Sequence, residues 1–193
     1  MWFNRYPFLW GLSITLSLIP VVQAEAQLVP DNTLGKENSL VNSVDSVTKR
    51  VDGGAIRGSN LFHSFQEFNI GNGQSVSFSN PIGIKNILTR VTGKNASQIF
   101  GKLGVLGDAN LFLINPSGIF FGENAKLDMG GSFIGSTANS LKLSDGTEFN
   151  AINPSINPIL TISVPLGLQY GNNPGNIELQ QGKAASQLEV ANS

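Results

Sequence analysis

The chain has 193 residues, a length typical of one domain, and only 13% of them are charged, about half the usual share. Its net charge of -1 provides no basic surface for nucleic acid. The absence of cysteine excludes disulfides, thiolate catalysis and cysteine metal sites. Abundant glycine and asparagine disfavour helices and favour many short strands joined by tight turns.

Residues 1–26 have the pattern of a signal peptide. Arg5 supplies a positive start, Pro7–Ile19 is apolar but short for a membrane span, and Pro20 ends that run. Cleavage is predicted after Ala26, with cleavage after Ala24 as the alternative. An uncleaved membrane anchor is the other interpretation of this segment. The chain is therefore expected to be exported.

Residues 27–50 are polar and predict irregular structure or thin strands at one end of the fold. From Gln74 to Ser79 the sequence alternates, with Val76 and Phe78 on the buried face of a strand. Apolar or alternating runs between glycine and asparagine turns predict further strands at Leu61–Ile70, Ile84–Val91, Ile99–Leu106, Ala125–Met129 and Ile159–Val164.

The clearest hairpin signal is Leu141–Phe149, where two alternating arms flank Asp145-Gly146. An Asp-Gly pair suits a type I′ turn. After a proline-rich joint and one further strand, residues 171–193 are polar again. This last segment is interpreted as a tail or as the start of a missing passenger.

The most informative segment is Asn110–Gly122, in which two apolar strands flank a four-residue polar corner, Asn115-Pro116-Ser117-Gly118. Proline fixes φ and favours an extended residue before it. Gly118 permits the positive φ that a sharp turn often needs. The Asn115 amide is expected to bond backbone groups that the turn leaves unpaired.

Two architectures fit these short strands: a sandwich or barrel, and a β-solenoid. A solenoid stacks its coils at about 4.8 Å, with an apolar column inside and asparagine ladders at the corners. Coils of roughly 20–25 residues would give the mature chain about seven of them. The apolar run Leu111–Ile114 suits a strand that is buried on both faces.

The sequence offers little for catalysis. His63 is the only histidine, lies between phenylalanines and is interpreted as structural, because one histidine cannot build a multi-histidine metal site. Arg90, Lys94 and Lys102 are isolated and are expected to be solvated. The acids are scattered, so no catalytic residue, metal or cofactor is predicted, although a carbohydrate-active enzyme stays open.

Four stretches in this order resemble the N-terminal secretion domain of filamentous haemagglutinin-type exoproteins, which use two-partner secretion. They are Gln27–Asp31, which resembles the mature start, Gly53–Phe65, Asn80-Pro81 with Ile87–Gly93, and Asn115–Ile119. The resemblance as a whole covers nearly the whole mature chain. The sequence departs from the family pattern in two places: Ser117 replaces an asparagine, and Ile82-Gly83 follow the first Asn-Pro pair.

The resemblance implies a right-handed parallel β-helix over residues 27–170, with extra-helical strands that include the predicted hairpin. It also implies passage through the periplasm, recognition by the POTRA domains of an outer-membrane β-barrel transporter, and nucleation of β-helix folding at the cell surface. The alternative is a surface adhesin that binds glycans or receptors. The secretion or fold motif comprises Asn80, Pro81, Asn115, Pro116, Ser117 and Gly118.

Overall fold

A computed structural model describes residues 27–180 and 189–191, and strands dominate this part of the chain. The signal peptide predicted for residues 1–26 lies outside the described residues. One 3-10 turn, η1 (Gly35–Glu37), interrupts the strands near the N-terminal end of the described part. Within the same residues, a search for helices with the length and hydropathy of a membrane span finds none.

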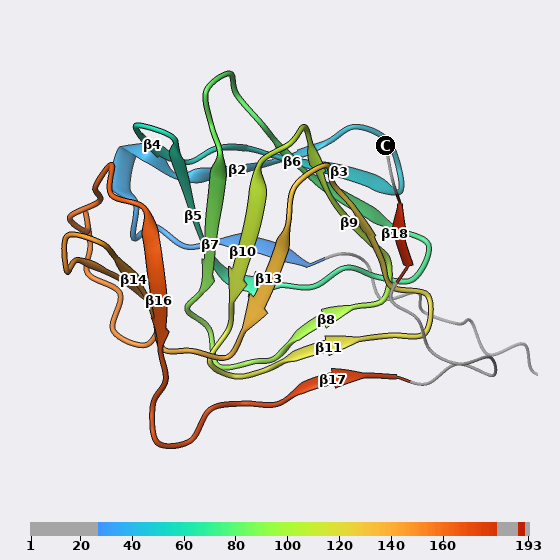
Figure 1. The fold of residues 1–193 in the computed structure, drawn as a ribbon. Helices are drawn as coiled ribbons and strands as arrows, with labels where there is room; N and C mark the ends of the chain where they lie inside the picture. The colour runs from blue at the N-terminus through green and yellow to red at the C-terminus, as the bar shows by residue number, and fades with distance from the viewer. Residues whose placement is uncertain (1–26, 181–188, 192–193) are drawn as a thin grey trace, which may run out of the picture.

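The coils of the chain stack into a solenoid whose faces are three mostly parallel sheets, as Figure 1 shows. The β10 sheet contains, in spatial order, β1 (Leu28–Pro30), β5 (Asn60–Phe68), β7 (Asn86–Val91), β10 (Asn110–Ile114) and β13 (Phe133–Ser136), with β4 (Ala55–Arg57) beside β5. The β11 sheet contains β8 (Ser97–Ile99), β11 (Ile119–Phe121) and β17 (Ile177–Leu179). The β9 sheet contains β18 (Glu189–Ala191), β12 (Lys126–Asp128), β9 (Lys102–Leu106), β6 (Ser75–Ser79), β3 (Thr48–Gly53) and β2 (Ser39–Ser43).

These sheets form a right-handed parallel β-helix, which confirms the predicted fold class. Asn60 is in register with Asn86, and Asn86 with Asn110, so successive coils are 26 and 24 residues long. The helix makes about three turns rather than the seven expected. The count was wrong because much of the chain lies outside the coils, at the N-terminal end and in an extra-helical sheet.

The N-terminal strands cover one end of the solenoid. β1 pairs antiparallel with β5, and β2 pairs antiparallel with β3, whereas the coil strands that follow pair in parallel. An antiparallel strand at the end of a parallel stack interrupts the repeat and protects its edge from further pairing. The thin strands predicted at one end of the fold are thus present.

Strand β10 separates two apolar cores, as expected for its apolar run. Leu111 and Leu113 point into the solenoid, where they join a column that includes Val76 and Phe78. Ile114 faces the other way, into a second core between the β10 sheet and the extra-helical sheet. The second core also contains, among others, Phe62, Leu88, Leu141, Leu143 and Phe149.

The extra-helical sheet consists of β15 (Glu148–Asn150), β14 (Ser140–Leu143) and β16 (Pro165–Gln169), all antiparallel. Its β14–β15 hairpin confirms the one predicted from the sequence. The turn differs from type I′, since among the described residues only Asn157 has a positive φ without being glycine. Asp145 instead accepts hydrogen bonds from the N–H and hydroxyl of Thr147, and Gly146 alone takes the positive φ, +85°.

The strand predicted at Ile159–Val164 is wrong, because residues 159–164 have no regular structure and β16 begins at Pro165. This stretch instead passes Asn60, whose side chain donates to the carbonyl of Ser163 over 2.7 Å. Further along, β17 lies within the predicted polar tail and pairs in parallel with β11. The boundary proposed at residue 170 stays a prediction.

Candidate functional site

The corner between β10 and β11 is built around the Asn115 amide. Its side-chain oxygen accepts from the N–H of Ser117 over 2.9 Å. Its side-chain nitrogen donates to the carbonyl of Asn95 and to the hydroxyl of Ser97, each at 3.0 Å. Since Asn95 and Ser97 belong to the preceding coil, this fully buried amide forms the turn and also ties two coils together.

The rest of the corner follows from its sequence. The N–H of Gly118 donates to the carbonyl of Asn115 over 3.0 Å, which closes the turn around Pro116. Gly118 has a φ of +123°, so the expected positive φ is present. The Ser117 hydroxyl reaches the carbonyl of Gly93 over 3.4 Å. Serine at this position therefore keeps a polar contact with the preceding coil.

The second predicted motif, Asn80-Pro81, occupies a different corner, where β6 ends. In the amide orientation that satisfies its neighbours, Asn80 donates to the carbonyl of Ile84 and accepts from the N–H groups of Asp108 and Ala109. It thus links its own turn to the next coil, as Asn115 does. The structure does not bring the two motifs together, because one follows the β9 sheet and the other the β10 sheet.

Sequence reasoning missed a buried polar cluster around Arg90. This side chain was expected to be solvated, but it is only 1% exposed. It donates to the hydroxyls of Ser64 and Thr33 over 2.8 Å and to the carbonyl of Asn150 over 2.6 Å. Its guanidinium lies 4.2 Å from the ring centre of Phe149. A charged residue inside the apolar run Ile87–Val91 was the available signal.

Asp31 completes this cluster from the N-terminal segment. Its carboxylate accepts from the hydroxyls of Ser64 over 2.7 Å and of Thr92 over 2.6 Å, and also bonds Thr33. Burial raises the pKa of Asp31, but hydrogen bonds from Thr33, Thr92 and Ser64 outweigh this and hold the pKa below its usual value. Burial lowers the pKa of Arg90 to about 10, partly opposed by Asp31, so both groups are charged at neutral pH.

The surroundings of His63 are those of a buried packing residue. It is buried inside the solenoid against Phe65 and Phe78, and its Nδ1 lies 3.0 Å from the hydroxyl of Ser39. Burial lowers the pKa of His63 to about 3, so the ring is neutral. The neighbouring Ser64 bonds Asp31 and Arg90 and is no partner of this ring. Within the described residues there is no cluster of three or more His, Cys, Asp or Glu that could hold a metal.

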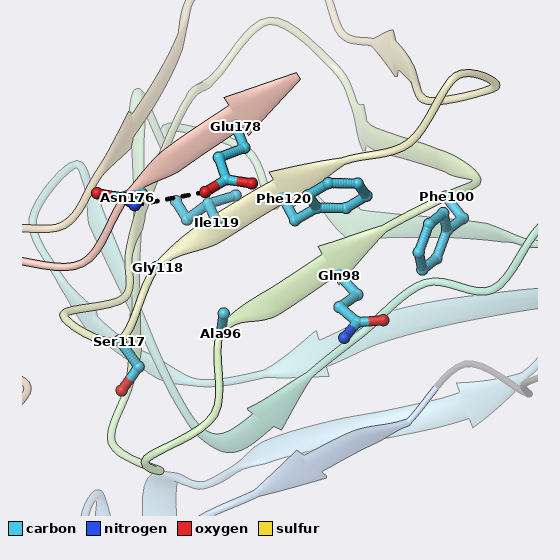
Figure 2. A pocket seen from close by; sticks show the side chains of 9 residues that line it. All are labelled: Ala96, Gln98, Phe100, Ser117, Gly118, Ile119, Phe120, Asn176 and Glu178. Atoms are coloured by element: carbon cyan, nitrogen blue, oxygen red, sulfur yellow. Dashed lines mark hydrogen bonds between the residues drawn. The ribbon is translucent and has the colours of Figure 1, made fainter. Parts of the chain in front are cut away.

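A groove of about 450 Å³ lies beside the Asn115 corner, on the outer face of the β11 sheet (Figure 2). Gln98 on β8 and Glu178 on β17 flank Phe120, because both residues are in register with Phe120 itself. Phe100 approaches Phe120 with a ring-centre distance of 5.6 Å. The remaining lining residues are Ala96, Ser117, Gly118, Ile119 and Asn176.

The parallel β-helix and its hydrogen-bonded corners define a β-solenoid domain. A family model described as the TPS secretion domain matches residues 26–193. The chain therefore belongs to the TPS secretion domain family, the secretion domain of two-partner secretion exoproteins. Such exoproteins are exported across the outer membrane to the cell surface or the extracellular space.

A heme/hemopexin-binding protein of Haemophilus influenzae is 38% identical over 69 residues, which is 36% of this chain. The match covers 7% of that protein, so the chain corresponds to a small part of its length. The family is a secretion domain of exoproteins and not a family of enzymes.

Proposed function

We propose that this domain is the secretion signal recognised by a dedicated outer-membrane transporter. The observation that carries the proposal is the family membership of residues 26–193, together with a corner motif that is built into the coils. The chain passes the periplasm largely unfolded and engages the periplasmic POTRA domains of the transporter. It performs no catalysis in this role.

Strand addition is the physical mode that suits this recognition. An extended chain offers every backbone N–H and C=O for pairing with an exposed sheet edge, and alternate side chains give the specificity. The short strands of this domain, three to nine residues each, present such segments before they fold. The same segments pair with one another once the chain has crossed the membrane.

We further propose that the emerging domain nucleates folding of a longer β-helix. Each coil pairs in parallel with the one before it, and its edge then templates the next. The antiparallel strands β1 and β2 cover one end of the stack, so further coils can be added only at the other end. A passenger that follows the domain would extend the stack from the other end.

The role of Asn115 in this function is to form the fold. Its amide is fully buried and all of its hydrogen-bonding groups are used within the domain. The folded domain therefore does not present Asn115 to a partner, so direct recognition of this residue would require the unfolded chain. The same argument applies to the interior contacts of Asn80, although that residue is partly exposed.

Secretion of an Asn115→Ala variant tests this proposal. We expect less protein in the medium of cells that produce the cognate transporter, and no secretion of either protein without it. The substitution leaves the Ser117 N–H and the Ser97 hydroxyl unpaired, which costs about 1–3 kcal/mol for each buried group. Asn72→Ala, in an exposed turn, is the control and should be secreted normally.

A matched core variant separates folding from recognition. Leu127→Ala removes a buried side chain from β12, outside both motifs, at a cost of about 2–5 kcal/mol. If secretion falls in proportion to stability in both variants, the motif acts through the fold. A much larger loss for Asn115→Ala at equal stability would mean that the transporter reads this residue directly. Normal secretion without any transporter would contradict the whole proposal.

The enzyme alternative gains no support from Asp128, one of the scattered acids. Asp128 forms an ion pair with Lys102 at 2.8 Å on the surface of the β9 sheet. A glycosidase needs two carboxylates facing one cleft. The adhesin alternative depends on a different surface, the groove beside Gly118.

A further inference from the structure

We propose that the groove on the outer face of the β11 sheet binds an uncharged oligosaccharide. This inference goes beyond the secretion role and does not depend on it. The groove combines two aromatic rings, Phe100 and Phe120, with the amides of Gln98 and Asn176 and one carboxylate, Glu178. A largely apolar surface with a few placed polar groups is the usual composition of a small-ligand site.

The small residues at its floor make the groove possible. A side-chain carbon added at Gly118 would lie 3.0 Å from the carbonyl of Asn176 and 3.3 Å from Cβ of Ala96. Any larger residue at Gly118 would therefore fill the space between the strands. Because Gly118 also takes the positive φ of the corner, one residue serves both the turn and the groove.

The backbone under the groove is already paired, so an occupant must be recognised by side chains. The N–H of Ser97 donates to Gly118, and the N–H of Ile119 donates to Asn176, at 3.0 and 2.9 Å. These bonds run between the strands of the β11 sheet, so the backbone at the floor of the groove, at Gly118 and Ile119, is already paired, and the edge of the sheet lies at β17. An extended peptide that binds by strand addition would thus find no partner groups here.

The side chains that line the groove suit a neutral sugar and disfavour a sugar that carries acidic groups. The face of an aromatic ring is negative, so it attracts the weakly positive C–H groups of a pyranose ring. Amide and carboxylate groups bond the hydroxyls at the rim of such a ring. Among the described residues, no lysine or arginine lines the groove, whereas Glu178, whose carboxylate lies 3.4 Å from the Asn176 amide, would repel sulfate or phosphate groups.

Figure 2 shows how these groups are placed. The rings of Phe100 and Phe120 lie at one end of the groove, Glu178 lies on the neighbouring strand β17, and Asn176 lies just before that strand. Gln98 extends from β8 on the other side of β11. Polar groups therefore flank the aromatic surface on both sides, an arrangement that a single stacked sugar ring can use.

Titration of the purified secreted protein with defined oligosaccharides tests the proposal. The probes are maltotetraose, cellotetraose and chitotetraose, with a heparin tetrasaccharide and choline as charged comparators. We expect calorimetry or chemical-shift mapping to detect binding of at least one neutral probe. Phe120→Ala should weaken that binding by about tenfold or more, because the stacking surface is lost.

Leu106→Ala is the matched control, since Leu106 is an exposed apolar residue of the β9 sheet, 58% exposed, and should leave binding unchanged. Circular dichroism and thermal melting establish that each variant is folded. Failure of all three neutral probes would overturn the proposal, as would equal binding by the Phe120→Ala variant. Binding of choline alone, lost in Glu178→Gln, would identify a cation site instead. Secretion is measured separately, so a failure here leaves the secretion role untouched.

Discussion

At a bend, backbone groups cannot all pair with a neighbouring strand, and buried polar side chains of this domain supply the missing hydrogen bonds. At Asn115 one amide satisfies a turn N–H and two groups of the preceding coil. At His63 the opposite holds, because Nδ1 lies near Ser39 while Nε2 is buried without a partner in the structure. A buried polar atom without a partner costs about 1–3 kcal/mol. The two residues therefore contribute to stability in opposite directions.

His63 should make the domain acid-sensitive. Its pKa is about 3 in the folded protein, lowered by burial from 6.5 and only partly offset by Asp52. Below pH 6.5 the unfolded chain binds a proton that the folded chain excludes, so stability falls as the pH is lowered toward 3. The slope is at most about 1.4 kcal/mol per pH unit for one group.

Urea unfolding between pH 7 and 5 measures this effect. His63→Asn, whose amide can still reach Ser39, should be less stable at pH 7 but should lose less stability on acidification than the wild type. This pH range lies above the titration of most carboxyl groups, which keeps their contribution small. Parallel pH profiles for the two proteins would show that His63 is not responsible.

At the level of elements, the coils are aligned by an asparagine row along one edge of the β10 sheet. The Asn86 amide donates to Asn60 over 3.1 Å, and the Asn110 amide donates to Asn86 over 3.2 Å. Asn110 in turn accepts from the N–H of Ser132 over 3.0 Å. Identical side chains stacked one strand apart fix the register of parallel strands, in which a slip by one residue would reverse every side chain.

Removal of the middle asparagine should weaken the stack more than removal of an exposed one. Asn86→Ala breaks both bonds of the row and should lower the free energy of unfolding by about 1–3 kcal/mol. Asn124→Ala, in an exposed turn, should change it by less than about 0.5 kcal/mol. Chemical denaturation followed by circular dichroism gives both values. An equal effect of the two substitutions would mean that the row has no special role.

The elements that sequence predicted well are those governed by local pattern. Alternation placed Val76 and Phe78 inside, and the Asp-Gly pair placed the hairpin. The corner at Asn115 followed from proline and glycine chemistry. The turn type failed because the Asp145 carboxylate bonds Thr147, a preference that competes with the type I′ conformation.

What the sequence could not show depends on contacts between distant segments. Arg90 is buried because residues 31–33 and 149–150 cover it, and the apolar run around it signals burial but does not identify the segments that cover it. The number of coils was overestimated for the same reason, since spacing alone does not distinguish coil strands from extra-helical ones. The secretion motif and its role likewise came from resemblance to a family and not from periodicity.

For the molecule as a whole, Arg90 joins three parts that would otherwise pack only through apolar contacts. It bonds Thr33 in the N-terminal segment, Ser64 in β5 and the Asn150 carbonyl in the extra-helical sheet. Burial of this charge is costly until all of these partners are present. The N-terminal segment, the solenoid and the extra-helical sheet should therefore fold together or not at all.

Arg90→Met tests this coupling, because methionine keeps much of the apolar contact with Phe149 while removing every hydrogen bond. We expect the free energy of unfolding to fall by about 3–5 kcal/mol, as when one member of a buried charge network is lost. The double variant with Asp31→Asn should lose less than the two single variants combined, since Asp31 then carries no unpaired charge. Hydrogen exchange should show protection falling in β1, β7 and β15 alike. Loosening confined to β14–β16, with an unchanged solenoid, would mean that the extra-helical sheet folds as a separate unit and that Arg90 only fastens it in place.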